Sequence, residues 1–230
     1  VSRFFVLLLL TGVGAIFVSL MFGYVPDDAL NLTARYYAEN TVRDTGAANI
    51  VAAIVVTFRG LDTLGEVTVL FLTASIVGLV LAGSQQGRLR REQPAPGELL
   101  VTGTRLLVPL TLLLGVYVFV NGHLTPGGGF QGGAILASAI LMLLLADPLR
   151  EFSHRLISVI ESISGLLFVA VGLLGMVYAG GFLDNRILPL GTLGDLISAG
   201  AIPVIYSFIG LKVGAEFSSM MVNLSETEEP

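Results

Sequence analysis

Residues 106–146 read LLVPLTLLLGVYVFVNGHLTPGGGFQGGAILASAILMLLLA, two apolar runs separated by a polar, glycine-rich segment. The runs, Leu106–Val120 and Gly132–Ala146, approach the roughly 20 residues that an α-helix needs to cross the hydrocarbon core of a bilayer. No water reaches that core, so every backbone group there must be hydrogen-bonded internally, as a helix does. The stretch therefore predicts two membrane helices joined by a short turn.

The composition supports a membrane protein. Of the 230 residues, 54% are apolar and only 13% are charged, whereas an ordinary soluble domain is about 25% charged. The apolar excess must face lipid. The net charge of −5 argues against a nucleic-acid partner, which needs a basic face. The chain has no Cys, and both His residues lie in predicted loops, so we predict no enzyme active site, no metal and no cofactor.

Four more apolar runs are long enough to span a membrane: Phe4–Tyr24, Leu64–Ala82, Leu156–Gly180 and Leu196–Val222. The first follows Arg3, as a signal peptide would, but its length and the lack of an Ala-x-Ala cleavage site favour a retained helix. We therefore predict an all-α polytopic membrane protein with about six transmembrane helices.

The segment before the second run is harder to interpret. Ala47–Phe58 is mostly apolar, but its twelve residues would reach only about 18 Å as a helix, too short to cross alone. A helix that continued to Ala82 would be too long for a bilayer. We therefore predict a break near Arg59 and Gly60, with a broken or re-entrant segment near residues 47–60.

The distribution of arginine predicts the orientation in the membrane. Cytoplasmic loops are enriched in Lys and Arg, and two loops of this chain are basic. We therefore expect both loops and both termini in the cytoplasm. The basic residues of the two loops are Arg88, Arg90, Arg91 and Arg105 in the first, and Arg150 and Arg155 in the second.

The first basic loop also divides the chain. We predict a membrane module at residues 1–83, an Arg- and Pro-rich cytoplasmic linker at 84–104, and a four-helix membrane domain at 105–224. An acidic tail follows at 225–230.

The glycine-rich turn contains Gly127–Gly132, which fits the pattern G-x-G-x-x-G of dinucleotide-binding folds, with Asp147 near the expected acidic position. The pattern follows an apolar helix and not a strand, so we predict that no nucleotide binds. Glycine instead permits unusual backbone angles and close packing. A tight structural turn is favoured, and a loop that lines a ligand site is the alternative. The residues concerned are Pro126, Gly127, Gly128, Gly129, Gly132 and Gly133.

Charged residues lie within two of the apolar runs. Arg59, Asp62 and Glu66 would share one helical face with Thr73. An ion pair between the first two would explain their presence, whereas a carboxylate one turn deeper favours an ion pathway, because a charge in the bilayer is costly. His123 is a further candidate, since it can titrate near neutral pH.

The last apolar run contains Lys212 and Glu216, four residues apart and far from either end. A neutralising pair that only packs, and a proton or cation relay, are equally consistent with this spacing. Gly210, Gly214 and Ser218 form a stripe of small residues, which lets another helix approach closely.

Longer motifs resemble a known family. Residues 121–145, NGHLTPGGGFQGGAILASAILMLLL, resemble the B-type subunits of Mrp-type multisubunit Na+/H+ antiporters. Residues 191–217, GTLGDLISAGAIPVIYSFIGLKVGAEF, resemble the equivalent subunit of ferredoxin-linked membrane-bound hydrogenases. Residues 45–70, TGAANIVAAIVVTFRGLDTLGEVTVL, are similar to the short E-type subunit of those hydrogenases and to the end of the large A-type antiporter subunit.

The resemblance implies a non-catalytic membrane subunit of a complex that moves Na+ and H+, with other membrane subunits and lipid as partners. It places Glu66 in a candidate ion pathway, beside the other candidates Asp62, Arg59, Lys212, Glu216 and His123. A purely structural scaffold subunit remains an alternative. An independent small secondary transporter is a further one, but it would be expected to show inverted repeats, and the two parts of this chain do not repeat each other.

Overall fold

The structure is a computed structural model that describes residues 3–24, 29–84, 96–148 and 150–226. The chain divides into two compact units, residues 1–36 and 37–230. Every regular element in the described part is helical, which confirms the predicted all-α class. The predicted arginines Arg88, Arg90 and Arg91, and the tail residues 227–230, lie outside the described residues.

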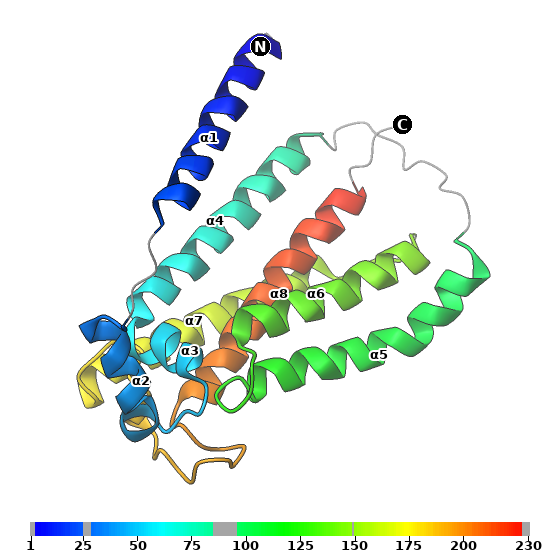
Figure 1. Cartoon of the computed structure of the whole chain (residues 1–230). Helices are drawn as coiled ribbons and strands as arrows, with labels where there is room; N and C mark the ends of the chain where they lie inside the picture. The colour runs from blue at the N-terminus through cyan, green and yellow to red at the C-terminus, as the bar shows by residue number, and fades with distance from the viewer. Residues whose placement is uncertain (1–2, 25–28, 85–95, 149, 227–230) are drawn as a thin grey trace. The chain divides into compact units, whose positions relative to one another are not determined.

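The helices follow one another along the chain as Figure 1 shows. They are α1 (Arg3–Gly23), α2 (Leu32–Thr45), α3 (Ile50–Ala53), the π-helix η1 (Ile54–Phe58), α4 (Gly60–Ser84), α5 (Glu98–Val120), α6 (Gly129–Ala146), α7 (His154–Tyr178), the 3₁₀-helix η2 (Asn185–Ile187) and α8 (Ile202–Glu226).

The first unit contains α1, which spans 21 residues. At 1.5 Å per residue this helix is about 31 Å long, the thickness of a bilayer core. The first apolar run is thus one helix of spanning length.

The predicted broken segment is confirmed. The Asn49 side chain caps α3 by accepting hydrogen bonds from the backbone N–H groups of Val51 and Ala52. The helix then widens into η1 and ends at Arg59, whose φ of −129° and ψ of 39° are not helical. The axis from residue 50 to 58 is bent by 84° from that of α2. Residues 50–58 therefore form a short segment that does not continue into α4.

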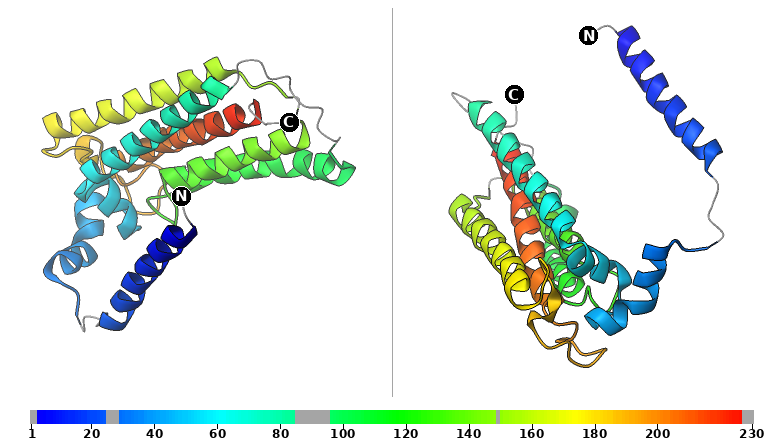
Figure 2. Two further views of the ribbon diagram at one scale, coloured as in Figure 1. Left: turned by 90° about the horizontal axis from the view of Figure 1, so that it is seen from above. Right: turned by 90° about the vertical axis from the view of Figure 1, so that its left-hand side faces the viewer.

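The second unit is a helix bundle around α8. This helix packs against α4, α5, α6 and α7, and Figure 2 shows it between the α4–α7 side and the α5–α6 side. Residues 121–128 and 179–201 join their helices at the same end of the bundle, where α4 also begins (Figure 1). Arg105, Arg150 and Arg155 belong to the opposite helix ends.

Five described helices are long and apolar enough to cross a membrane, and the number reaches six if the bent pair of α2 and residues 50–58 counts as one span. These are α1, α4, α5, α6 and α7. Helix α8 falls below the hydropathy of the others because it contains Lys212 and Glu216, yet it is as long as α7, with 25 residues each. A helix enclosed by its neighbours needs no apolar surface toward lipid.

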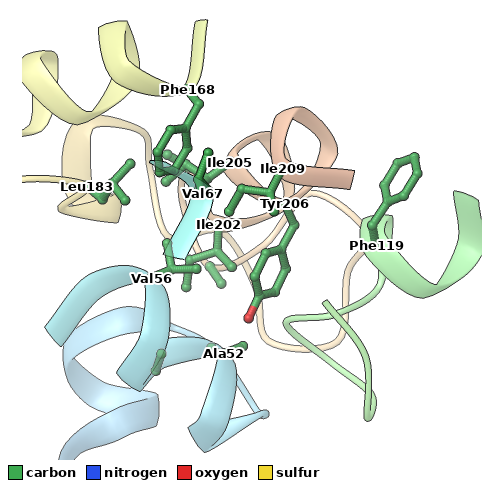
Figure 3. Close-up of a cluster of buried hydrophobic side chains, with 14 of the residues drawn as sticks. Ala52, Val56, Val67, Phe119, Phe168, Leu183, Ile202, Ile205, Tyr206 and Ile209 are labelled. Atoms are coloured by element: carbon green, nitrogen blue, oxygen red, sulfur yellow. The ribbon is translucent and has the colours of Figure 1, made fainter. Parts of the chain in front are cut away.

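The hydrophobic core lies where the broken segment meets the beginning of α8 (Figure 3). Val56 comes from η1, Phe168 from α7, and Ile202, Ile205 and Ile209 from α8; all are at most 1% exposed. Burying side chains of this size stabilises the fold by about 1.5–3 kcal/mol each where water is the alternative environment. The core therefore fixes residues 50–58 against the bundle.

Glycines set the distance between α6 and its neighbours. A Cβ atom on Gly129 would lie 2.5 Å from Ile209 Cβ, and one on Gly133 would lie 2.7 Å from the Gly210 carbonyl oxygen. A Cβ atom on Gly132 would lie 2.7 Å from the carbonyl oxygen of Gly115 on α5. Only a residue without a side chain permits these approaches, so the small-residue stripe of α8 receives α6.

Two helix boundaries differ from the sequence prediction. Helix α5 begins at Glu98, so the last residues of the predicted linker are helical and precede Leu106. Helix α8 begins at Ile202 and not at Leu196, because Ala199 and Gly200 have φ values of 59° and 58°, outside the right-handed helical region. These two residues form the turn that leads into α8.

The glycine contacts predict the effect of single methyl groups. We expect Gly133→Ala and Gly129→Ala to destabilise the protein by about 1–3 kcal/mol, because the added carbon would overlap α8. Gly103→Ala on α5 is the matched control: nothing lies within 4 Å of its added carbon, so it should be neutral or stabilise by about 0.5–1 kcal/mol. The measurement is the thermal unfolding midpoint of the purified protein. Equal midpoints for Gly133→Ala and Gly103→Ala would contradict the packing described.

Candidate functional site

A buried ion pair lies in the middle of α8. Lys212 Nζ is 2.7 Å from Glu216 Oε1, and the two side chains are 9% and 0% exposed. Their spacing of four residues places both on one helical face. The pair combines full burial with opposite charge, so each residue is the counterion that the other requires.

Two further residues shape the surroundings of Lys212. Its Nζ atom lies 4.8 Å from the centre of the Phe71 ring on α4, a cation–π contact. Gly165 on α7 faces the stem of the side chain, since a Cβ atom there would be 3.3–3.4 Å from the lysine Cδ, Cε and Nζ. Helices α4 and α7 thus hold the ammonium group at one position.

Lys212 also lines a cavity of about 310 Å³ between α4, α7 and α8. Glu161 lines this cavity on the α7 side and is half-buried. The other walls are formed by Leu64, Val67, Thr68, Phe71, Ser162, Gly165, Leu166, Phe168 and Val169.

The charges around this cavity do not balance. Lys212 pairs with Glu216 and lines the same cavity as Glu161, so two carboxylates lie near one ammonium group. When all three groups are ionised their sum is −1, and a proton or a cation would neutralise it. Glu216 Oε2 has no hydrogen-bond partner among the described residues. The arrangement can therefore accept a positive charge in a region where unbalanced charge is costly.

The predicted stripe on α4 lies on a different face. Arg59 and Asp62 form an ion pair and their side chains are 61% and 52% exposed. Glu66 and Thr73 are also exposed, and the Glu66 side chain has no hydrogen bond or ion pair within the described ranges. The neighbouring residue Val67 faces the cavity. The structure therefore does not bring Glu66 together with Lys212.

His123 lies apart from both groups, in the connection between α5 and α6. It is fully buried, and its Nε2 is 3.1 Å from Ser198 Oγ and 3.4 Å from the Asp195 carbonyl oxygen. The Asp195 carbonyl only accepts, so it pairs with a form of the ring that carries a proton on Nε2. Burial lowers the pKa of His123 below its usual 6.5, although the backbone carbonyls of Asp195 and Val120 raise it in part.

The glycine segment forms the turn from α5 into α6. Gly128 has a φ of 156°, which favours glycine, and precedes the first residue of α6. A Cβ atom on Gly127 would lie 2.6 Å from the Val118 carbonyl oxygen. A helix precedes this turn and none of the described residues forms a strand. Close packing therefore gives a geometric basis for interpreting this segment as structural. Its residues are Pro126, Gly127, Gly128, Gly129, Gly132 and Gly133.

Sequence reasoning missed several residues of the site. Phe71 and Gly165 belong to apolar runs in which aromatic and small residues are common, so nothing marked them individually. Asn185 was also missed. It is fully buried, and its Nδ2 donates hydrogen bonds to the carbonyls of Thr45 and Ala199. The signal available in the sequence was a single polar amide side chain between a glycine-rich turn and the apolar helix α8.

Fold and site together define a class, a multi-pass helical membrane subunit with buried charges. Residues 99–219 match the family described as a domain related to the MnhB subunit of Na+/H+ antiporters, and residues 2–102 match the family of the E-type subunits of MBH, described as MbhE. The chain belongs to the MnhB-related family. The two matched ranges meet within residues 99–102.

Solved structures show the same arrangement. The chain is 38% identical to a chain of the membrane-bound sulfane sulfur reductase, an archaeal respiratory membrane complex, with a TM-score of 0.82 over 96% of this chain and 97% of that one. It is 29% identical to a chain of the Mrp complex from Dietzia sp., with a TM-score of 0.77 over 98% of this chain but only 26% of that one.

Two further relatives are similar to this chain in sequence. An uncharacterized protein of Methanocaldococcus jannaschii is 32% identical over 77% of each chain. The B-type Na+/H+ antiporter subunit of Bacillus subtilis is 38% identical over 41% of this chain and 68% of that one.

The ion pair of α8 predicts non-additive mutational effects. Lys212→Met or Glu216→Gln alone leaves one charge without its partner, and we expect each to cost about 3–5 kcal/mol of stability. The double variant should return to within about 1 kcal/mol of the wild type. Arg59→Gln is the control, because removal of an exposed pair costs only about 0–1 kcal/mol. Thermal midpoints and membrane levels test this; a double variant as unstable as the singles would refute it.

His123 predicts a dependence of stability on pH. The folded pKa is lowered, so below the unfolded value of 6.5 the unfolded chain binds more protons and stability falls as the pH falls. We expect the thermal midpoint of the wild type to drop between about pH 7 and 5, and that of His123→Asn to drop less. His154→Asn, which changes an exposed histidine, should retain the wild-type profile. Parallel profiles for His123→Asn and the wild type would exclude this residue as the cause.

Proposed function

We propose that this chain is a non-catalytic membrane subunit of an Mrp-type module that couples the movement of cations and protons. The observation that carries the proposal is a cluster formed by the buried Lys212–Glu216 pair and by Glu161, of which Lys212 and Glu161 line one cavity, in a chain that belongs to a family of antiporter-related subunits. The cluster has one more acid than base, so it can take up and release a proton or a monovalent cation within the helix bundle.

The parent complex is proposed from the relatives, which include a Na+/H+ antiporter subunit and a chain of an archaeal respiratory membrane complex. We propose a prokaryotic plasma membrane, with cytoplasmic termini, and Na+ and H+ as the transported ions. The module at 1–83, the linker at 84–104 and the domain at 105–224 correspond in this proposal to an E-type subunit fused to a B-type subunit.

The exposed face of α4 supports a subunit over an independent transporter. Glu66 lies about 9 Å along α4 from Gly60, on a face that also contains Asp62 and Thr73. Lipid is a poor environment for such a carboxylate, whereas another protein or a hydrated passage can accommodate it. The Dietzia chain is much longer than this one, so the equivalent segment there continues into additional protein.

A scaffold role is the second candidate, and one observation favours it. Lys212 and Glu216 neutralise each other at 2.7 Å and are almost fully enclosed, as expected for a pair that only joins helices. The two candidates predict different effects for a substitution that removes a charge but keeps the size of the side chain. Glu66 is suited to such a substitution because none of the described residues pairs with it.

The experiment uses the whole complex in vesicles, with cation flux driven by a pH gradient. We expect Glu66→Gln to assemble normally and to lose at least ~10-fold of the flux, since the amide preserves size but cannot carry a proton. Glu66→Asp should retain part of the flux. Glu98→Gln, at the exposed start of α5, is the control and should transport normally. Wild-type flux in Glu66→Gln, with equal subunit levels, would remove Glu66 from the ion pathway.

A further inference from the structure

A second cavity, of about 420 Å³, lies between α5 and α6 at the helix ends opposite the glycine-rich turn. Its size falls within the range of roughly 300–1,000 Å³ that is typical of ligand sites. Its apolar walls come from both helices, and its polar residues are Thr104, Arg105, Asp147 and Arg150. The apolar lining consists of Val101, Val108, Pro109, Leu143 and Ala146.

Thr104 gives this cavity an unsatisfied hydrogen-bonding group. Its side chain is only 4% exposed and lines the cavity. Its Oγ1 atom has no hydrogen-bond partner among the described residues, although a helical threonine ordinarily bonds to the carbonyl four residues earlier, as Thr111 bonds to Leu107. A buried hydroxyl without a partner is costly, so a ligand that accepts its proton would recover that cost.

Two arginines supply the charge. Arg105 and Arg150 line the cavity and neither forms an ion pair within the described part of the chain. Asp147 also lines it, so the three side chains sum to +1. A net charge of +1 favours a singly charged anion over a metal cation. Planar guanidinium groups bind phosphate in a bidentate manner, so that anion is expected to be a phosphodiester.

Pro109 is one of the residues that line the cavity. It lies inside α5, and proline has no N–H to donate to the carbonyl of the residue four positions earlier, here Arg105. The turn that contains Thr104 and Arg105 therefore lacks one helical hydrogen bond.

We propose that this cavity binds the headgroup of an anionic glycerophospholipid. Arg105 and Arg150 bind the phosphate, the Thr104 hydroxyl donates to one of its oxygens, and Asp147 accepts from a hydroxyl of a polyol headgroup. The valines and Leu143 contact the first carbons of the acyl chains. Basic pockets between membrane helices on the cytoplasmic side are a known mode of lipid recognition, and the predicted orientation places both arginines on that side.

The test measures lipid retention by the purified complex in native mass spectrometry. The complex is stripped of lipid and then exposed to vesicles of phosphatidylcholine with a minor fraction of phosphatidylglycerol. We expect the wild type to retain phosphatidylglycerol at least ~10-fold above its share of the vesicles. The double variant Arg105→Gln/Arg150→Gln should lose that preference, because each charged hydrogen bond to phosphate contributes strongly. Arg155→Gln, an exposed arginine of α7 outside the cavity, should leave it unchanged.

Thr104→Val provides a second readout if the double variant fails to assemble. The substitution preserves shape, so an empty site predicts equal or higher thermal stability and no effect on lipid. The proposed site predicts several-fold weaker retention of phosphatidylglycerol. Unchanged preference in Thr104→Val or in the double variant would overturn the proposal. Complete displacement of the lipid by millimolar inorganic phosphate would assign the cavity to free phosphate instead.

Discussion

The arrangement of the bundle depends on the ion pair between Lys212 and Glu216. Two charges in the middle of a membrane helix cannot face lipid without a large cost, so α8 must be enclosed by other helices. Helices α4, α6 and α7 provide that enclosure, and Phe71 and Gly165 fit around the lysine. The central place of α8, its low hydropathy and the glycines that receive it all follow from this burial.

The end of the bundle that contains the loops is fixed by polar side chains. The Asn49 side chain donates hydrogen bonds to the carbonyls of Gly122 and Thr125, 2.8 and 3.0 Å away, and Asn185 donates to Thr45 and Ala199. Non-helical backbone near a membrane is tolerated only where such groups satisfy it. These bonds connect the broken segment to both loops, so α4 and α8 begin from one rigid base and hold the cavity between them.

The sequence predicted the helical class, the broken segment at residues 47–60 and five of the six spans, because these depend on hydropathy, length and backbone satisfaction alone. It also predicted that Lys212 and Glu216 share a face, since four residues are about one helical turn. It did not predict that Glu66 and Lys212 lie apart, or that Glu161 joins the latter. Those relations depend on how α4 and α7 are rotated about their axes against α8. That rotation is set by packing at Val67 and Gly165, which hydropathy does not encode.

The central claim is that the cluster around Glu216 changes its charge when the complex moves ions. Infrared difference spectroscopy on the reconstituted complex tests it directly, with a step in Na+ concentration or pH applied to the vesicles. The account predicts a carbonyl band of a protonated carboxylic acid that changes with the step and is absent in the Lys212→Met/Glu216→Gln variant, while the band of an Asp62→Asn variant matches the wild type. Identical difference spectra for the wild type and the double variant would contradict it.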